Sequence, residues 1–595
     1  PLGFVGVFAL LPLPGAHSVS QAEMRQDPSQ SEAVQRRHIL TVVLEDYCHV
    51  APVSGVVPTD YWHRFESRVQ RNTETTLDLL DEMGAKATFF VLGWIAEHQP
   101  DVVAEVVRRG HEVASKGYFH RSIRQMTQDQ FREDLRRSRD ALQDATGRAV
   151  RGYRVPRGGF GKDDRWALDL LIEEGFVFDS SSRPLGFAFT GEPHRRFIHE
   201  YTSAAGRIWE VPLSTWKLGP LYLPVSGGNF VRQLPEAFIR RAMSVWEEKV
   251  ADPLVFYFHV WELDPDQPRI TAVSRLNRVR QYRNLGEMPD RIRYYLKQYT
   301  FESIGDYLKL PAAEAVAARG VSPPTPASET PAADEIGARV PISVIVPCFN
   351  EEATLGYTAN TLRSFAGRVQ NQFEISYVFV DDGSQDQTWQ RLNELFGARA
   401  DCVLIRHPHN RGVAAATLTG IANSRAEVVC AIDCDGTYDP LQLRKMVPML
   451  TQDVDIVTAS PYHPDGKVLN LSGWRLLLSK GLSGLYRVFH HHKLYTYTSC
   501  FRVYRRSSVK EIFVRNERFV GIMEILSRVD AQGGRIVECP AVMEVRLLGD
   551  SKMKILKTIW GHLMWMGQMV FFRTEMVPPT LTVPEEKLRD TAGHA

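Results

Sequence analysis

Short apolar runs that end in acidic or polar residues recur along the C-terminal part of the chain. They occupy residues 341–349, 377–380, 403–406 and 428–432. Each run has the length and β-branching of a buried parallel strand. Amphipathic or small-residue helices are expected between the runs, the first through Leu362 and another over 413–422. This alternation predicts a doubly wound, nucleotide-binding α/β sheet.

A similar alternation fills the N-terminal part of the chain. Strands are predicted at 38–44, 87–92, 111–115, 152–156 and 255–259, and helices at 68–83 and 100–109. Polar residues again follow the strands. The pattern predicts a distorted (β/α) barrel with polar groups gathered at the carboxyl ends of its strands.

Residues 311–340 separate the two parts. This stretch is rich in Ala and Pro and nearly free of large apolar residues, so it cannot build a core. We therefore expect domains at 38–310 and 341–575, with a leader over 1–37 and a tail over 576–595. No segment reaches the roughly 18 uncharged apolar residues of a membrane-spanning helix, so both domains are expected on one side of a membrane.

Composition narrows the class of protein. A chain of 595 residues with 44% hydrophobic and 24% charged residues is soluble and globular, with two to four domains expected. With 71 basic and 70 acidic residues it has no overall field to attract nucleic acid. None of the seven cysteines has C-x-x-C spacing, which favours reduced thiols in a cytoplasm.

The run at 428–432 ends in Asp433-Cys434-Asp435. Two carboxylates at the carboxyl end of a strand suit Mg²⁺ or Mn²⁺ carrying a diphosphate. A single D-x-D also fits an ordinary strand-to-turn junction, where Asp is common.

Four motifs in order decide between these alternatives: PCFNEE (347–352), VDDGSQDQT (380–388), NRGVAAA (410–416) and DCDGTYDP (433–440). Together they resemble the family 2 glycosyltransferases with the GT-A fold. SCFRVYRR (499–506) and RLLGDSKMK (546–554) resemble later motifs of the dolichyl- or polyprenyl-phosphate sugar synthases. The resemblance implies transfer of a sugar from a nucleotide sugar, with inversion at the anomeric carbon.

The resemblance also implies roles for individual residues. The nucleotide-sugar site would be formed by Pro347, Asn350, Glu351, Asp381, Asp382 and Gly412, the glycine admitting the donor close to the backbone. Asp433 and Asp435 would hold the metal and the diphosphate, so Asp435 would also be catalytic.

The acceptor is suggested by a missing carboxylate. A hydroxyl acceptor needs a general base, and many relatives have an Asp just before T-S-x-F-R, but Tyr495–Ser499 contains none. A phosphate monoester, with a second pKa of about 6, is already anionic at neutral pH. We therefore expect a lipid phosphate or related glycan acceptor. Arg502, Arg546 and Lys552 are candidates to hold that phosphate; ordinary surface charge is the alternative for each.

Two segments suit a membrane surface. Residues 474–489 place apolar side chains on one helical face, and residues 552–572 begin with lysines and continue into Trp and Phe. Basic residues beside aromatic ones on an amphipathic helix are typical of the membrane interface. The expected location is cytoplasmic and peripheral, on the inner face of the membrane. The alternative for each segment is a helix packed on the domain core.

In the N-terminal domain, the segments KATFFVLGW (86–94), GHEVASKGYFH (110–120), RGYRVPRG (151–158) and FYFHVWELDP (256–265) resemble the NodB-type polysaccharide deacetylases, in particular the subgroup of exopolysaccharide export clusters. The resemblance implies removal of N-acetyl groups with a divalent, zinc-type metal held by one carboxylate and two histidines. It makes Asp46 and His120 metal ligands and Arg154 and His259 catalytic residues.

Two departures put this activity in doubt. The family's base position is Val43, and its first metal histidine is Lys116. A protonated lysine has no lone pair to give to zinc. We expect the Lys116 ammonium to lie within salt-bridge distance of Glu45 or Asp46, near His120, with Val43 in apolar surroundings.

Three hypotheses follow. The first is a glycosyltransferase acting on polyprenyl phosphate, fused to a degenerate deacetylase-like domain. The second is a bifunctional deacetylase and transferase of cell-envelope or exopolysaccharide synthesis, with Glu45 or Asp46 as a substitute base. The third is a glycan-binding scaffold without activity, which the intact Asp433-Cys434-Asp435 disfavours.

Overall fold

The computed structural model describes residues 36–184, 193–218, 221–316, 339–469, 473–544, 546–549 and 560–567. The predicted leader, most of the predicted linker, the predicted tail and Lys552 lie outside these ranges. All seven cysteines are described, and all are free thiols, as their spacing predicted.

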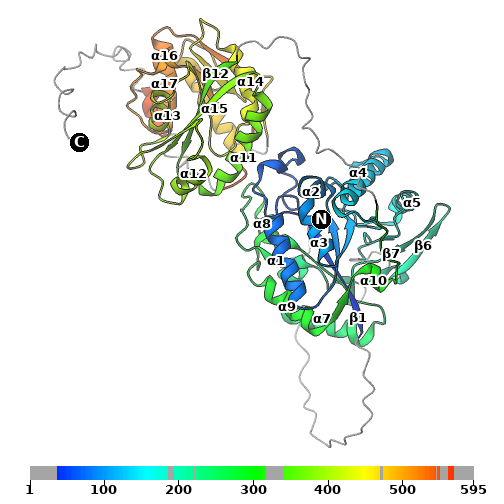
Figure 1. Cartoon of the computed structure of the whole chain (residues 1–595). Coiled ribbons are helices and arrows are strands. Elements are labelled where there is room, and N and C mark those ends of the chain that lie inside the picture. The colour runs from blue at the N-terminus through cyan, green and yellow to red at the C-terminus, as the bar shows by residue number, and fades with distance from the viewer. Residues whose placement is uncertain are drawn as a thin grey trace, which may run out of the picture. The chain divides into compact units, whose positions relative to one another are not determined.

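The N-terminal domain is built on one curled sheet with helices around its outside (Figure 1). In spatial order its strands are β10 (Val255–His259), β1 (Arg37–Leu44), β2 (Thr88–Val91), β3 (Glu112–Ser115), β4 (Gly152–Tyr153), β5 (Phe178–Asp179), β7 (Gly206–Glu210) and β6 (His199–Ser203). All neighbours are parallel except β6 with β7, and β11 (Thr300–Glu302) also pairs with β1. The sheet is thus an open half-barrel, which confirms the predicted distorted (β/α) class.

Strand β1 runs through the centre of this domain, and its alternation divides the core. Leu40, Val42 and Leu44 join the large cluster of buried apolar side chains, whereas Ile39 and Val43 join a smaller, separate cluster. Successive strand residues point to opposite faces of a sheet, so Thr41, Val43 and Glu45 share one side. This is the side of β1 on which the Glu45 cluster, described below, is built.

The helices of this domain begin and end where local chemistry dictates. Helix α4 (Gln128–Thr146) starts at Thr127, whose side chain accepts a hydrogen bond from the Gln130 backbone, and ends at Gly147 with φ of 64°. Its buried residues recur every three or four positions. The predicted helices 68–83 and 100–109 correspond to α1 (Val69–Glu82) and α3 (Pro100–Arg108).

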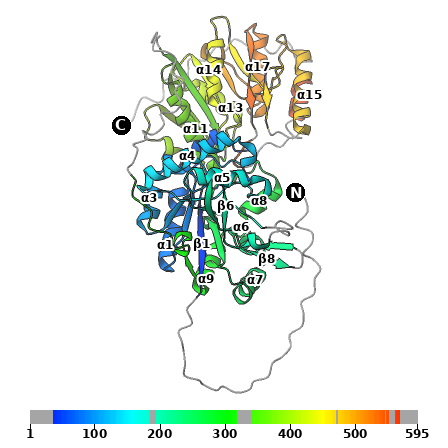
Figure 2. The same cartoon turned by 90° about the vertical axis from the view of Figure 1, so that its right-hand side faces the viewer.

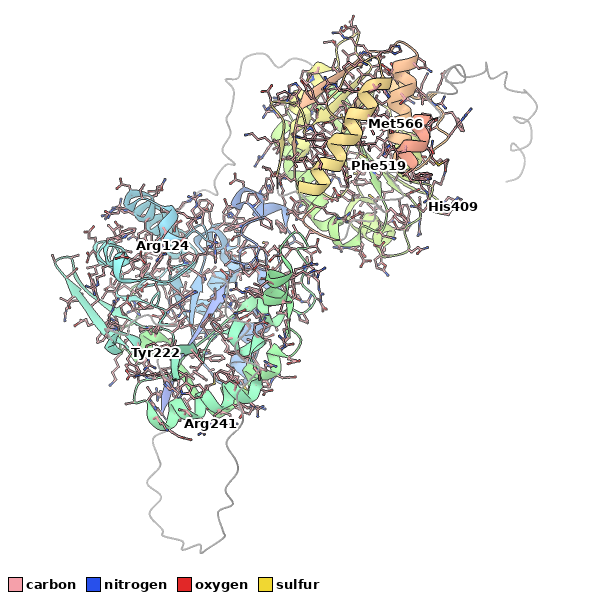
Figure 3. The ribbon with its side chains drawn as sticks, turned by 180° about the vertical axis from the view of Figure 1, so that it is seen from behind. Arg124, Tyr222, Arg241, His409, Phe519 and Met566 are labelled. Carbon is pink, nitrogen blue, oxygen red and sulfur yellow. The ribbon has the colours of Figure 1, made fainter. Side chains whose placement is uncertain are left out.

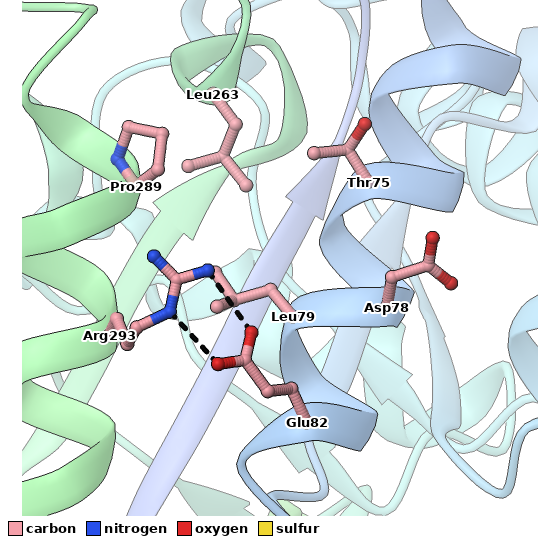
Figure 4. A pocket seen from close by; sticks show the side chains of 7 residues that line it. All are labelled: Thr75, Asp78, Leu79, Glu82, Leu263, Pro289 and Arg293. Carbon is pink, nitrogen blue, oxygen red and sulfur yellow. Dashed lines mark hydrogen bonds and ion pairs between the residues drawn. The ribbon is translucent and has the colours of Figure 1, made fainter.

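A surface hollow of about 260 Å³ lies beside α1 and α9 (Met288–Gln298) and is crossed by the Glu82–Arg293 ion pair (Figure 4). None of the predicted site residues lines it. Its lining residues are Thr75, Asp78, Leu79, Glu82, Leu263, Pro289 and Arg293.

The C-terminal domain has a second sheet. Its strands, in spatial order, are β14 (Cys402–Arg406), β13 (Phe373–Asp381), β12 (Val340–Cys348), β15 (Val428–Ala431), β18 (Arg502–Arg505), β16 (Ile456–Ser460) and β19 (Ile536–Pro540). The first four are parallel, and β18 is antiparallel to both neighbours. Cys348 is in register with Asp381, and Ile345 with Ala431. The loops after β12, β13 and β15 therefore meet at one edge of the sheet.

Small residues allow close packing on this sheet. Helix α13 (Val413–Ala422) crosses β12 at Gly420, where a Cβ atom would come within 2.3 Å of Ile345. Helix α17 (Phe519–Ala531) approaches Ala414 at Gly521, where a Cβ atom would lie 2.6 Å from the alanine methyl. The small-residue run at 413–422 is thus a packing requirement of the fold. Figure 2 shows α13, α15 and α17 in this domain.

Helix α15 (Gly473–Phe489) packs beside a short helical segment, residues 560–567. The Tyr486 hydroxyl and His562 Nδ1 are 2.7 Å apart, and His562 also contacts Phe519 with ring centroids 5.9 Å apart. Figure 3 labels Met566 on the segment 560–567 and Phe519 at the start of α17. Among the described residues, no helix combines the length and apolar character needed to cross a bilayer.

Candidate functional site

The Asp433-Cys434-Asp435 motif follows β15 at the edge of the sheet where the three loops meet. Gly436, with φ of 72°, turns the chain, and Thr437 donates from its backbone N (3.0 Å) and its hydroxyl (2.5 Å) to Oδ1 of Asp435. One oxygen of Asp435 is thereby fixed by the turn. Its other oxygen lies 3.7 Å from Nη1 of Arg546.

Asp433 lies in a concentration of negative charge. Burial, together with the carboxylates of Asp435 and Glu351, raises the pKa of Asp433 to about 8, although Arg546 acts against the shift. Like charges that are desolvated together resist ionisation unless a cation joins them. Hard carboxylate oxygens at this position fit a divalent cation, with phosphate oxygens of a bound ligand to complete its coordination.

Glu351 and Arg546 form an ion pair beside Asp435. Oε1 of Glu351 accepts from Arg546 Nη1 at 2.9 Å, Oε2 contacts Nη2, and the Thr354 hydroxyl donates to Oε2 at 2.8 Å. Burial raises the pKa of Glu351, although Arg546 acts against this shift. Arg546 thus brings a positive charge to the edge of an acidic cluster, where a diphosphate would bind.

Asn350 connects two of the loops. It adopts a left-handed backbone conformation with φ of 54°, which Asn tolerates better than most residues. Its backbone N donates to the Ser384 hydroxyl (2.9 Å), and its side-chain oxygen accepts from the Gln385 backbone (2.8 Å). Pro347 lies half-buried on β12, in register with Val380.

Asp381 lies at the end of β13 and is buried. Its carboxylate accepts from the Ser384 backbone (3.0 Å) and pairs with Nε of Arg406, also at 3.0 Å. Arg406 was not among the predicted site residues. Its position at the end of β14, in register with Asp381, was the available signal.

Asp382 and Gly412 hold the loop before α13 through their own contacts, and their predicted place in the donor pocket stays a prediction. The Asp382 carboxylate accepts from the backbones of Arg411 (3.0 Å) and Gly412 (2.7 Å) and the side chain of Asn410 (2.9 Å), and it contacts His407 (2.7 Å). Gly412 has φ of 122°, and a Cβ there would lie 2.5 Å from the Glu517 carbonyl. Both residues hold the loop before α13 in place.

Arg502 requires a correction. Its side chain is fully buried, and it donates to the carbonyls of Ile522 (2.7 Å) and Tyr497 (2.5 Å). These bonds connect β18 to α17 and to the turn before β18, so the guanidinium is not displayed to an acceptor phosphate. Of the three predicted phosphate ligands, Lys552 is not described, and Arg546 is the one placed beside the aspartates.

The N-terminal domain has a second cluster, centred on Glu45 after β1. Oε2 of Glu45 lies 3.5 Å from Lys116 Nζ and 3.3 Å from His120 Nε2, and Oε1 lies 3.4 Å from His259 Nε2. Burial alone would raise the pKa of Glu45, but Lys116, His120 and His259 together hold it well below its usual range. The expected approach of Lys116 to Glu45 is therefore confirmed.

Asp46 faces the other way, so its prediction as a metal ligand beside His120 is corrected. Its carboxylate accepts from the backbones of Tyr47 (2.9 Å) and Arg68 (2.8 Å) and from the Ser67 hydroxyl (3.3 Å). Asp46 therefore holds the start of α1. The carboxylate beside His120 is Glu45, whose predicted role as a substitute base stays a prediction.

His259 extends the cluster outward. Its Nδ1 lies 3.1 Å from Glu262, which is itself paired with buried Arg232 at 2.8 Å. Arg154 is buried beside this cluster and donates to the Thr41 hydroxyl (3.0 Å) and to the carbonyl and hydroxyl of Ser180 (3.1 and 2.7 Å). Val43 is buried among apolar residues that include Phe90 and Tyr257, as predicted.

Known families match three parts of the chain. Residues 60–171 match the family described as Polysaccharide deacetylase, residues 180–309 match a domain of unknown function (DUF3473), and residues 343–513 match Glycosyl transferase family 2.

Similar proteins of known activity include transferases that act on dolichol or polyprenol phosphate. A dolichol-phosphate mannosyltransferase of Pyrococcus furiosus is 27% identical over 239 residues, covering 38% of this chain and 65% of the relative. A polyprenol monophosphomannose synthase of Mycolicibacterium smegmatis is 29% identical over 218 residues, covering 35% of this chain and 80% of the relative. The chain thus spans just under two thirds of the first relative's length.

Among solved structures, a putative polysaccharide deacetylase from Mycobacterium smegmatis matches 49% of this chain and 94% of its own, with 19% identity and a TM-score of 0.32. The family matches fall on the two domains that the two sheets define. The chain joins a polysaccharide deacetylase domain to a family 2 glycosyltransferase domain.

Proposed function

We propose that the C-terminal domain transfers a sugar from a nucleotide sugar to a polyprenyl phosphate at the membrane surface. The observation that supports this most directly is the convergence of Asp433, Asp435, Glu351 and Arg546 at the carboxyl edge of the sheet. The two relatives described above, a dolichol-phosphate mannosyltransferase and a polyprenol monophosphomannose synthase, support the same acceptor class.

The reaction is a single displacement. An oxygen of the acceptor phosphate forms a bond to the anomeric carbon, and the bond from that carbon to the nucleoside diphosphate breaks, which inverts the configuration. A divalent cation, Mg²⁺ or Mn²⁺, held by Asp433 and Asp435 would neutralise the charge that develops on the departing diphosphate. Arg546 is placed to stabilise the same charge through its guanidinium.

The donor's nucleotide would lie between the loops after β12 and β13. Asn350 and Ser384 fix these two loops to each other, and Asp381 offers a buried carboxylate at their base. Asp382 acts indirectly, by holding the neighbouring loop through Gly412. In this arrangement no protein base is needed, because the acceptor phosphate is already ionised.

Membrane contact is the second part of the proposal. Helix α15 turns Leu477 (74% exposed), Leu478, Leu485 and Val488 (71% exposed) outward, while Tyr486 packs inward. The neighbouring segment likewise turns Trp560 (65% exposed), Leu563 and Met564 outward, while His562 and Trp565 are buried. Two adjoining helices with apolar outer faces form a surface suited to the interface of a bilayer.

This surface, on the cytoplasmic face of a membrane, would bring the transferase to the phosphate head of a lipid whose chain remains in the bilayer. Lys480 and Arg487 are exposed on the same helix and would meet anionic headgroups.

The test is transfer by the full chain from a panel of radiolabelled nucleotide sugars to polyprenyl phosphate in vesicles, with Mg²⁺ or Mn²⁺ added. Asp435→Asn should abolish transfer while keeping the thermal unfolding midpoint close to that of the wild type. Near-normal turnover of this variant would show that the donor site is elsewhere.

A further inference from the structure

The Glu45 cluster has the position of a metal centre but a different composition. The deacetylase family implies a metal held by one carboxylate and two histidines. Glu45 does have two histidines beside it, His120 and His259, but the Lys116 ammonium approaches the same carboxylate oxygen as His120. Lys116 stands where the family's first metal histidine would, so a positive charge without a lone pair occupies that ligand position. The residues present therefore do not fit the implied metal.

Lys116 is unsuited to the role of ligand. An ammonium offers three donors and no acceptor, so it can bind a carboxylate but cannot coordinate a cation. Its Nζ lies 3.5 Å from Glu45 Oε2, the same oxygen that His120 approaches. A second cation at this oxygen would have to displace the ammonium and meet its repulsion.

The chain around Lys116 is held so that the side chain cannot swing aside with its loop. The Lys116 backbone donates to the Val91 carbonyl (2.9 Å), and the backbones of Tyr118 and Phe119 donate to the Asp134 carboxylate (2.9 and 3.2 Å). Gly117, with φ of 70°, has no room for a Cβ, which would lie 2.7 Å from Asp134. The backbone of this loop is therefore fixed at the point from which the buried Lys116 side chain reaches Glu45.

The opposite side of the cluster has also lost a charge. Val43 lies on the same face of β1 as Thr41 and Glu45, and Thr41 is a hydrogen-bond partner of Arg154. The buried Arg154 guanidinium donates to the hydroxyl and the carbonyl of Ser180 and to the Thr41 hydroxyl, all of them neutral groups. A carboxylate at position 43 would lie next to Arg154, and an apolar side chain takes its place.

We propose that the Lys116 ammonium is the counter-ion of Glu45, and that the deacetylase domain is a metal-free, non-hydrolytic domain stabilised by this internal ion pair. One positive side chain replaces the divalent cation, so the buried carboxylate is neutralised without any bound metal. A buried carboxylate without such a partner would be strongly destabilising, which explains why the lysine and the loss of metal ligation belong together.

Metal content of the full-length protein tests the first half of this proposal. After incubation with zinc sulfate and removal of free metal, wild type and Glu45→Gln should contain the same zinc per chain, because no zinc depends on Glu45. Lys116→His should gain one zinc per chain, and Lys116→His/Glu45→Gln should lose it again. One equivalent of zinc that disappears from the wild type on Glu45→Gln would overturn the proposal.

A double-mutant cycle tests the ion pair itself. Lys116→Met and Glu45→Gln should each lower the thermal unfolding midpoint of the full chain, whereas the double variant should unfold at a higher temperature than Lys116→Met alone. Lys86→Met, at a half-exposed lysine 3.6 Å from Asp81, is the matched control and should change the midpoint little. A double variant no more stable than Lys116→Met, or a Lys116→Met variant as stable as wild type, would contradict the internal counter-ion.

Discussion

The guanidinium of Arg546 binds the Glu351 carboxylate with two of its nitrogens and lies 3.7 Å from Asp435. It therefore joins the end of β12 to the aspartates that follow β15. A bound diphosphate would offer this arginine a stronger partner than Glu351 does, since phosphate carries more negative charge.

Arg546→Ala should lower kcat for sugar transfer by about 10²- to 10³-fold, the usual cost of removing one group that stabilises developing charge. Arg546→Lys should recover only part of the rate, because an ammonium cannot reproduce the two-pronged contact. Arg444→Ala, at an exposed arginine of the same domain, is the control. Equal rates for Arg546→Ala and the control would exclude Arg546 from the site.

Gly412 and Gly484 form a matched pair for backbone strain. Gly412→Ala should destabilise the protein by more than about 1 kcal/mol, because a Cβ at φ of 122° is strained and would contact the Glu517 carbonyl. Gly484 lies exposed on α15 with no atom near its missing Cβ, so Gly484→Ala should stabilise the helix by about 0.5–1 kcal/mol. Chemical denaturation of both variants measures the difference. Equal and small effects would mean that the loop before α13 can relax.

His562 makes the contact between α15 and the segment 560–567 depend on pH. Burial lowers the pKa of His562 from 6.5 to about 4, so the unfolded state takes up a proton before the folded state does. Stability from this contact is therefore present above pH 6.5 and is lost as the pH falls toward 4, by up to about 3 kcal/mol.

His562→Asn should remove most of this pH dependence. The measurement is the difference in unfolding midpoint between wild type and variant at pH 7.5 and at pH 5, which should be smaller at pH 5. A difference that is the same at both pH values would show that His562 does not titrate between the folded and unfolded states.

The apolar face of α15 should determine vesicle binding. Leu477→Glu and Val488→Glu should each weaken binding to anionic vesicles by about tenfold or more, since each removes roughly 1.5–3 kcal/mol of apolar burial. Leu276→Glu changes a similarly exposed leucine on α8 (Arg275–Tyr282) of the other domain and should leave binding unchanged. Sedimentation with vesicles at low and high salt measures the binding of each variant. If all three variants sediment like wild type, the proposed membrane surface is wrong.

Most secondary structure could be predicted from the sequence, because apolar periodicity and its interruptions are local properties. The expected helix 413–422 coincides with α13, and the strand expected at 38–44 corresponds to β1 (Arg37–Leu44). The fold class followed from the order of these elements and from the motifs at the strand ends.

The functions of neighbouring acidic residues could not be separated in the same way. Glu45 and Asp46 are adjacent, and strand alternation sends one to the cluster and the other to the start of α1. Counting from Val43 would have shown that Glu45 shares its side of β1. The burial of the Arg502 guanidinium could not be predicted, because it depends on carbonyls of Tyr497 and Ile522 that only the fold brings close.

The order of strands in the C-terminal sheet has a consequence for synthesis on the ribosome. Strand β15, which leads into Asp433, pairs on one side with β12 and on the other with β18, which is made more than 70 residues later. Until β18 emerges, the nascent domain has an unpaired strand edge beside the turn that carries Asp433 and Asp435, a situation that favours association with other chains. Stalling synthesis just before residue 502 should therefore yield a chain that requires a chaperone, whereas stalling well beyond residue 540 should not.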